Sequence, residues 1–142
     1  TDALKVVWTP GKTANVTEQD ILEAKLFDDW AVTNVHFNFD VHNISGSGLD
    51  QTGLQNGFTQ PKGYSIPYRC FVPKTIDNLL LAGRDISGTH MAHSNYRVMP
   101  ICANMGQAVG TAAALCIKHA VSPRDLDINL LQSLLSAQGV NP

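Results

Sequence analysis

Alternating apolar and polar positions predict a strand over residues 35–42. Every second side chain is apolar and the others are polar: Val35, Phe37, Phe39 and Val41 against His36, Asn38, Asp40 and His42. Because successive side chains on a strand point to opposite faces, one face is apolar and the other polar. The run NLLLAG, residues 78–83, is apolar almost throughout and predicts a short strand buried on both faces.

Three other segments have helical patterns. Thr17, followed by Asp20 three residues later, is the capping-box pattern and predicts a helix over about 18–31. Residues 101–119 are apolar nearly all round, which indicates a buried helix. Asp127 is expected to cap a last amphipathic helix that ends at Gly139. Its apolar positions are Leu130, Leu131, Leu134 and Leu135.

The remaining segments are expected to be connections or short extended pieces. Residues 3–8 can form a short strand, and 43–57 form a long loop rich in Gly, Ser, Asn and Asp. The stretch 64–73 looks extended, but Pro67 excludes a regular central strand there. Residues 84–100 are expected to be an irregular polar connection.

These elements together predict an α/β chain of mixed α+β type. Residues 1–77 are expected to mix α and β elements with a long loop, and 78–142 to form a strand–helix–helix unit. A lone buried strand over 78–83 needs neighbours in a sheet, and the chain has few other long apolar runs. A partner segment is therefore expected to complete that sheet.

Composition narrows the classes of function. The 142 residues contain 10 Lys+Arg and 12 Asp+Glu, a net charge of −2, and no basic stripe, so nucleic acid is not an expected partner. Hydrophobic residues make up 44%, enough for a core. No apolar run approaches the ~18 residues of a membrane span. Three scattered cysteines argue against a disulfide framework and a zinc site. Without an initiator Met or a signal pattern, we expect a processed chain, a subunit or a piece of a longer protein, in an undetermined compartment.

The junction from residue 83 into the helix over 101–119 has two interpretations. A helix N-terminus presents unpaired N–H groups and about half a positive charge. Gly106, Ala108 and Gly110 make one helix face almost bare, and glycines permit close approach of another group. The small residues indicate either tight packing of helix on sheet or a site for an anion or cofactor.

Several blocks in order resemble the FAD-dependent oxidoreductase family, two-domain flavoproteins related in layout to the fumarate reductase flavoprotein group. The C-terminal blocks are NLLLAGRDISGTH and RVMPICANMGQAVGTAAAL. They follow YSIPYRCFVPKTIDN, which is similar to that family's Y-x-I-P-Y-R-C-L-V-P-K stretch. VTEQDILEAKLFDDWAV resembles its L-T-x-x-D-V helix, and FDVHN resembles its D-I-H segment. The resemblance runs from about Gly11 to Gly139.

The resemblance implies that 1–77 are part of a substrate or cap domain and that 78–142 are the C-terminal strand–helix–helix segment of the FAD-binding domain. It also implies FAD as the cofactor. Residues 83–85 are then expected near its ribityl and pyrophosphate part, and the start of the helix over 101–119 near the flavin ring or ribityl chain. A helix N-terminus there stabilises negative charge on the reduced ring. The implied cofactor-binding residues are Gly83, Arg84, Asp85, Asn104, Met105, Gly106, Gln107 and Ala108.

One part of such a flavoprotein does not occur in these 142 residues. The ADP half is bound by a strand–G-x-G-x-x-G–helix unit. The nearest run, GSGLDQTG, lacks the spacing, a preceding buried strand and a following helix. We therefore expect this chain to be the C-terminal part of the enzyme, with an N-terminal FAD-binding segment as its partner. By itself it is expected to bind FAD weakly or not at all.

A polar cluster between the two cofactor-facing pieces supplies candidate catalytic residues. His90, His93 and Arg97 are expected to act on the substrate, with Tyr96 as a further substrate contact. Oxidation of a carbon centre by flavin needs a base and a hydride acceptor. His suits the proton, and Arg suits a carboxylate or developing negative charge. The alternative is a polar loop whose histidines are solvated or cap backbone groups.

Two further clusters are candidates for the substrate side. The polar face over 36–42 is either solvated or, through histidines and Asp40, a metal site. The resemblance favours Asp40 and His42 as lining of a substrate cavity, and we expect no metal there. Tyr68 and Arg69 are also candidate substrate contacts, whereas Cys70 is expected to be a small buried residue.

Two functions follow from these patterns. The first is hydride transfer from a small organic substrate to FAD, with the isolated chain inactive. The second is a non-catalytic α+β ligand-binding or interaction module that does not bind FAD by itself. Sugars, hydroxy acids and other alcohol- or amine-bearing molecules all remain possible substrates.

Overall fold

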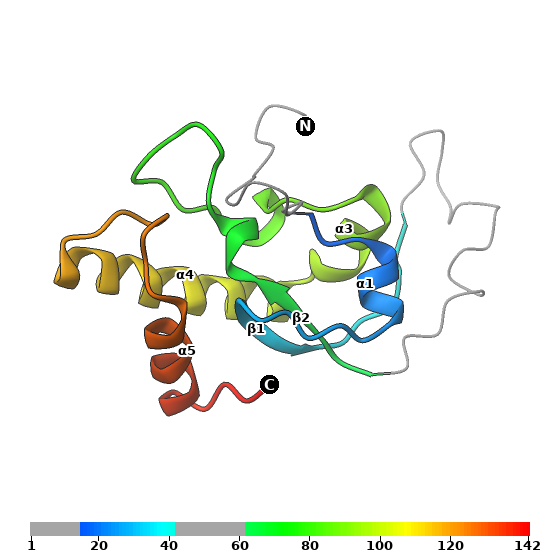
Figure 1. The fold of residues 1–142 in the computed structure, drawn as a ribbon. Helices are drawn as coiled ribbons and strands as arrows, with labels where there is room; N and C mark the ends of the chain where they lie inside the picture. Colours follow the sequence, from blue (N-terminus) through cyan, green and yellow to red (C-terminus); the bar gives the residue numbers. More distant parts are fainter. Residues whose placement is uncertain (1–14, 42–61) are drawn as a thin grey trace.

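The computed structural model describes residues 15–41 and 62–142, and its mixed α and β content confirms the predicted fold class. A central pair of strands lies between α1 and α3 on one side and α4 and α5 on the other (Figure 1). The elements, in chain order, are α1 (Glu18–Leu22), β1 (Trp30–Val35), β2 (Tyr64–Pro67), the 3-10 turns η2 (Tyr68–Phe71) and η3 (Gly83–Asp85), α3 (His90–Tyr96), α4 (Met99–His119) and α5 (Ile128–Ala137).

The two strands pair antiparallel, with Trp30 opposite Pro67 and Val35 opposite Tyr64. Pro67 is the last residue of β2, a position where its missing N–H is tolerated. The chain then continues into η2. Register shifts occur on both sides of Val32, so β1 is bulged. Bulges bend a strand and re-aim its side chains, and here they affect residues that line a cleft described below.

The predicted strand over 35–42 is wrong in position. The strand covers 30–35, and residues 36–41 have no regular secondary structure. Val35, Phe39 and Val41 are buried as the alternation predicts, but Phe37 is 39% exposed. The alternating pattern is therefore followed only in part by burial and does not produce pairing in a sheet.

The first helix is shorter than the predicted 18–31. Its capping box is confirmed, because the Thr17 hydroxyl accepts from the Asp20 backbone N–H and the Asp20 carboxylate accepts from the Thr17 N–H. The helix ends at Leu22, and Ala24 adopts a left-handed conformation with φ 50°. Ala31, expected on the same helix face, lies in β1, where burial against the core outweighs its helical preference.

Residues 78–83 do not form the predicted buried strand. Leu79 is 38% exposed, and Leu80 to Ala82 are half-buried. The segment is held by Leu81, whose N–H donates to the Phe71 carbonyl at 2.8 Å. Within the described residues it joins no sheet, which agrees with the expectation that further segments complete its surroundings.

The expected irregular connection over 84–100 is also partly wrong, because α3 forms within it. Thr89 is the N-cap, and its side chain accepts from the Ala92 N–H. Thr89 also donates to the carboxylate of Glu18 at 2.7 Å, which ties the start of α3 to α1. The sequence carried this signal, since Thr is a favoured N-cap residue.

The long helix and the last helix are confirmed near their predicted bounds. α4 spans Met99–His119, but only one of its faces is buried: Met99 is 86% and Ile117 is 84% exposed. The prediction that this helix is buried all round is therefore wrong for the described chain. α5 is capped by Asp127, ends before Gly139 and contacts both α4 and β1.

By length and composition alone, α4 is apolar enough to cross a membrane. This property was not predicted, because Gly, Thr, Asn and Gln interrupt the apolar residues of this helix. The same composition is found in core helices of water-soluble proteins. The inner face of α4, including Met105, Ala108 and Ala112, is fully buried against the rest of the fold, so this face contributes to the core.

One hydrophobic core joins the two parts of the chain that we divided at residue 78. It contains Val32 and Ile66 from the strands together with Met105 and Leu131 from α4 and α5. The division into 1–77 and 78–142 stays a prediction about the larger protein. The predicted strand over 3–8, the loop over 43–57 and His42 lie outside the described residues.

Candidate functional site

The junction singled out in the sequence is a contact between η3 and the start of α4. Gly83 has a φ of 67°, which L side chains rarely adopt. A Cβ on Gly83 would lie 3.7 Å from the Cys102 Sγ, in ordinary contact. Backbone conformation, rather than lack of room, therefore accounts for glycine at this turn. Arg84 and Asp85 follow it and are exposed.

His93 lies against this junction. Its Nε2 is 3.2 Å from the carbonyl oxygen of Arg84. Because a carbonyl only accepts, Nε2 carries the proton in this contact, and Nδ1 is left with the lone pair. Burial lowers the pKa of His93 below its ordinary value, and the nearby positive charge of Arg97 acts in the same direction. The neutral imidazole is thus the favoured form near pH 7, as a general base requires.

His90 occupies the first position of α3, three residues before His93. Residues three apart are neighbours on a helix surface. His90 is exposed, whereas His93 is half-buried and stacks edge-on against the Tyr96 ring, with 5.4 Å between centroids. The two histidines thus lie on the same side of α3, but His93 is less exposed than His90 and packs against Tyr96.

Arg97 and Asp40 form an ion pair, which joins a predicted catalytic residue to a predicted substrate residue. Arg97 Nη2 donates to the Asp40 carboxylate at 2.6 Å and to its backbone carbonyl at 3.0 Å. Both side chains are partly exposed. This pair places the end of α3 beside the segment that follows β1. Arg97 and Asp40 are 57 residues apart in sequence.

The remaining candidates for substrate contact have partners inside the fold. Tyr68 and Tyr96 are completely buried and donate to the carbonyls of Pro123 and Ile86. Burial raises the pKa of both hydroxyls, so both stay protonated.

Arg69 is also buried, and Cys70 beside it is inert. Arg69 pairs with Asp29, and its guanidinium lies over the Phe27 ring at 4.9 Å. Its Nε makes no hydrogen bond within the part of the chain that the structure describes. Burial raises the pKa of the Cys70 thiol to about 12, so this residue is the small buried cysteine that we expected, not a nucleophile.

The five predicted cofactor residues on α4 divide between two faces. Met105 and Ala108 point into the core and are fully buried. Asn104, Gly106 and Gln107 are exposed, and Asn104 and Gln107 line the cleft described below. A Cβ on Gly106 would meet nothing within 4 Å, so the described fold does not itself require glycine there. An outer group approaching closely would require it.

The start of α4 has the chemistry that an anionic or electron-rich group needs. Its N-cap residue, Val98, makes no side-chain capping bond, and Pro100 lies in the first turn. The exposed N–H groups at a helix start favour negative charge. The residues present therefore fit the part of FAD that the resemblance puts here.

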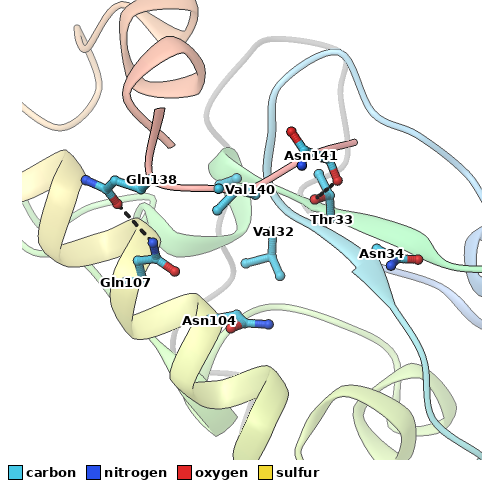
Figure 2. Close-up of a pocket in the computed structure, with 10 residues that line it drawn as sticks. Val32, Thr33, Asn34, Asn104, Gln107, Gln138, Val140 and Asn141 are labelled. Atoms are coloured by element: carbon cyan, nitrogen blue, oxygen red, sulfur yellow. Dashed lines mark hydrogen bonds between the residues drawn. The ribbon is translucent and has the colours of Figure 1, made fainter. Parts of the chain in front are cut away.

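A cleft of about 330 Å³ lies beside the same helix start, between β1, α4 and the C-terminal segment (Figure 2). Its lining is uncharged and rich in carboxamides: Ala31, Val32, Thr33, Asn34, Asn104, Gln107, Gln138, Gly139, Val140 and Asn141. Only Asn104 and Gln107 were predicted from the sequence. The others come from separate elements and have no common motif, so their meeting could not be predicted.

Asn34 is held in an unusual conformation at the edge of this cleft. Its φ is 53°, within the bulged part of β1, and its Oδ1 faces the His36 ring at 2.9 Å. Gly63 packs against both residues: a Cβ there would lie 2.4 Å from the Asn34 Oδ1 and 2.8 Å from the His36 Nε2. Asn34 and His36 are both exposed, and a left-handed conformation outside glycine is uncommon enough to suggest a functional role.

Among the residues that the structure describes, no group of three His, Cys, Asp or Glu side chains is arranged to hold a metal ion. His36 faces Asn34, and Asp40 pairs with Arg97. The metal alternative for the polar face over 36–42 therefore gains no support from 36–41.

Comparison with models of protein families finds a match over most of the chain. The model of a family described as FAD dependent oxidoreductase matches residues 13–135, most of the chain. Neither the curated proteins nor the solved structures gave a match. The family match covers the η3–α4 junction, α3, the Arg97–Asp40 pair and both strands. The chain belongs to the FAD dependent oxidoreductase family.

Proposed function

We propose that this chain is the C-terminal part of an enzyme that transfers a hydride from a small organic substrate to FAD. The observation that carries the proposal is the contact of His93 with the η3–α4 junction. There a half-buried, neutral imidazole lies beside the turn and the helix start that are expected to hold the cofactor.

His93 is the proposed base. Its Nε2 is bonded to the Arg84 carbonyl, so Nδ1 is the atom that accepts a proton from a substrate hydroxyl or amine. The backbone bond fixes the tautomer and the ring orientation, as second partners of catalytic histidines do. His90, more exposed on the same side of α3, is the proposed second contact for the substrate.

Arg97 is proposed to hold a negatively charged or developing oxyanion group of the substrate. Its guanidinium has five N–H donors, and the Asp40 contacts use only one of its nitrogens, Nη2. Asp40 then positions Arg97 and also borders the substrate. Tyr68, Arg69 and Tyr96 are proposed to support the site from the core, since all three are buried and bonded there.

The cofactor is proposed to lie against η3 and the outer side of the α4 start. Gly83, Arg84 and Asp85 would hold it from the turn, and Asn104, Gly106 and Gln107 from the helix. Met105 and Ala108, which are buried, would set the position of α4 rather than touch the cofactor. FAD, when bound, supplies the hydride acceptor.

A further segment, with the nucleotide-binding fingerprint, is proposed to cover the exposed apolar surface beside α4. A groove of about 500 Å³ lies there, lined mainly by apolar residues of the 78–80 segment, α4 and residues 121–123. Leu79 and Ile117 are large apolar side chains left exposed beside or within it. Without that segment the chain is expected to bind FAD weakly and to be inactive.

The test measures whether the complete protein binds FAD and whether a substrate reduces the bound flavin. After reconstitution with FAD, it should keep a stoichiometric flavin with absorbance in the flavin region, and a reacting substrate should bleach it. A complete protein that stays colourless after reconstitution would refute the proposal. It would leave the second function, a non-catalytic ligand-binding or interaction module. The 142-residue chain alone should retain little flavin in the same assay.

A further inference from the structure

The cleft between β1, α4 and the C-terminal segment has a lining suited to one chemical class. Among the residues that the structure describes, five with carboxamide side chains and one threonine line it, and no charged residue does. Each carboxamide has both hydrogen-bond donors and an acceptor. A hydroxyl group also donates and accepts, so an array of carboxamides matches an array of hydroxyls. A charged ligand would lose hydration here without gaining an opposite charge.

The size of the cleft also suits a small ligand. Its volume of about 330 Å³ lies at the lower end of the ~300–1,000 Å³ range of small-molecule sites. Val32 and Val140 form apolar lining between the polar groups (Figure 2). Sugars present both hydroxyl groups and apolar C–H faces. The polar lining suits the hydroxyl groups and the two valines suit the C–H faces.

The polar groups are held in place by contacts that link the three elements. Gln107 of α4 donates to the Gln138 Oε1 at 2.9 Å, and Thr33 of β1 donates to the Asn141 carbonyl at 2.7 Å (Figure 2). Within the described part of the chain, the Asn104 carboxamide makes no hydrogen bond of its own. These hydrogen bonds thus hold the residues at the edge of the cleft in place. The Asn104 carboxamide is available to bond a ligand.

Asn34 adds an independent indication. A left-handed conformation outside glycine costs free energy, and the bulge of β1 and the close fit of Gly63 maintain it here. Asn is one of the few residues that accept this conformation readily. The bulge carries a carboxamide to the edge of the cleft, a role that bulges commonly have beside binding sites.

We infer that this cleft binds an uncharged, hydroxyl-rich ligand such as a sugar or polyol, at a site separate from the substrate contacts proposed above. The lining residues do not include His90, His93, Arg97 or Asp40. Asn104 and Gln107 line the cleft and also belong to the proposed flavin site, so the ribityl chain of FAD is the other source of hydroxyl groups. The two sources are distinguished by whether FAD prevents the binding.

The experiment is calorimetric titration of the complete protein, with and without FAD, using D-glucose and ribitol as neutral probes. D-Glucuronate and D-glucosamine are the matched charged probes. Glucose or ribitol should bind saturably in both forms, and the charged probes roughly tenfold more weakly. Absence of saturable binding by either neutral probe, or equal binding of the charged probes, would overturn the inference. Binding that FAD abolishes would assign the cleft to the ribityl chain and overturn the inference.

Two variants test the location. Gln138→Leu removes a carboxamide from the rim, and Asn34→Gly removes one while keeping the left-handed backbone. Each should weaken neutral-probe binding roughly tenfold, the loss expected for one hydrogen-bonding group. Gln19→Leu is the control, because Gln19 is exposed on α1 and bonds only to Glu23. Unchanged binding in both cleft variants would contradict the assignment.

Flavin content is measured separately by absorbance, so failure of the proposed function is distinguishable. A colourless protein that still binds glucose would refute FAD chemistry but keep the polyol site. A yellow protein that binds no polyol would refute this inference alone.

Discussion

His93 lies with its Nε2 3.2 Å from the carbonyl oxygen of Arg84, so the imidazole of α3 is bonded to the turn that precedes it. This contact orients the ring and assigns the proton to Nε2. It also joins two residues that the sequence suggested for different roles, one for the substrate and one for the cofactor.

Replacing His93 by Ala in the complete enzyme should leave FAD bound but slow flavin reduction by substrate by about 100-fold or more, the usual contribution of a general base. Stopped-flow absorbance at the flavin band measures both the flavin content and the rate. His90→Ala is the paired variant, with a smaller expected effect because His90 is more exposed. Unchanged reduction rates in both variants would remove the catalytic role from α3.

The pH dependence of flavin reduction should reflect the lowered pKa of His93. Burial favours the neutral imidazole, so the base stays active to a pH below the ordinary value of about 6.5. The rate should fall only as the pH drops through the lowered pKa, where His93 takes up a proton. A rate measured from pH 5 to 8 tests this, and an acid limb centred well above pH 6.5 would disagree with it.

The Arg97–Asp40 pair should contribute modestly to stability, because both side chains are partly exposed. Asp40→Asn is expected to lower the free energy of unfolding by about 0.5–1 kcal/mol, measured by urea denaturation. Asp77→Asn is the control, since Asp77 pairs with Arg124 but is 76% exposed. Its expected effect is near zero. An equal loss in the two variants would mean that the first pair has no special geometry.

Gly63→Ala should destabilise the protein by about 1–3 kcal/mol, the usual cost of overpacking. The new Cβ would lie 2.8 Å from the Asn34 Cα, a backbone atom that cannot move without disturbing β1. Gly106→Ala is the matched control, because a Cβ there meets nothing within 4 Å. Helix propensity predicts that it stabilises the isolated chain by up to about 1 kcal/mol. Thermal unfolding of both variants makes the comparison.

Gly106 should matter for the cofactor even though the described fold does not need it. In the complete enzyme, Gly106→Val should crowd the outer side of the α4 start and weaken FAD retention. Flavin released during gel filtration measures this. Retention equal to that of the unchanged protein would exclude a close approach of FAD at this position.

Sequence reasoning succeeded where local chemistry decides the structure. The capping box of Thr17 and Asp20, the extent of α4 and the Asp127 cap were all predicted correctly. These features depend on residues within a few positions of one another. The same holds for Cys70, whose small apolar side chain is buried as expected.

Prediction failed where contacts between distant parts of the chain determine the local structure. Residues 36–41 alternate in polarity like a strand, yet pairing with β2 begins and ends earlier, because Trp30 and Val35 meet Pro67 and Tyr64. The segment 78–83 has the composition of a central strand but no strand beside it in the described part of the chain. Whether this segment pairs as a strand depends on residues elsewhere in the protein, which its own composition does not reveal.

The candidate site was predictable only in part, for a similar reason. The family resemblance supplied the η3–α4 junction and the residues of α3. It did not supply the Arg97–Asp40 pair or the cleft lined by Asn34 and Gln138. Those contacts join positions tens of residues apart, and no spacing in the sequence encodes them.

The measurement that tests the central claim most directly is reconstitution of the complete protein with FAD, followed by anaerobic addition of candidate substrates. We predict one tightly held flavin per protein, and loss of flavin absorbance with a reacting substrate at a rate that His93→Ala lowers. A protein that holds no flavin, or a flavin that no substrate reduces and that is indifferent to His93, would contradict it.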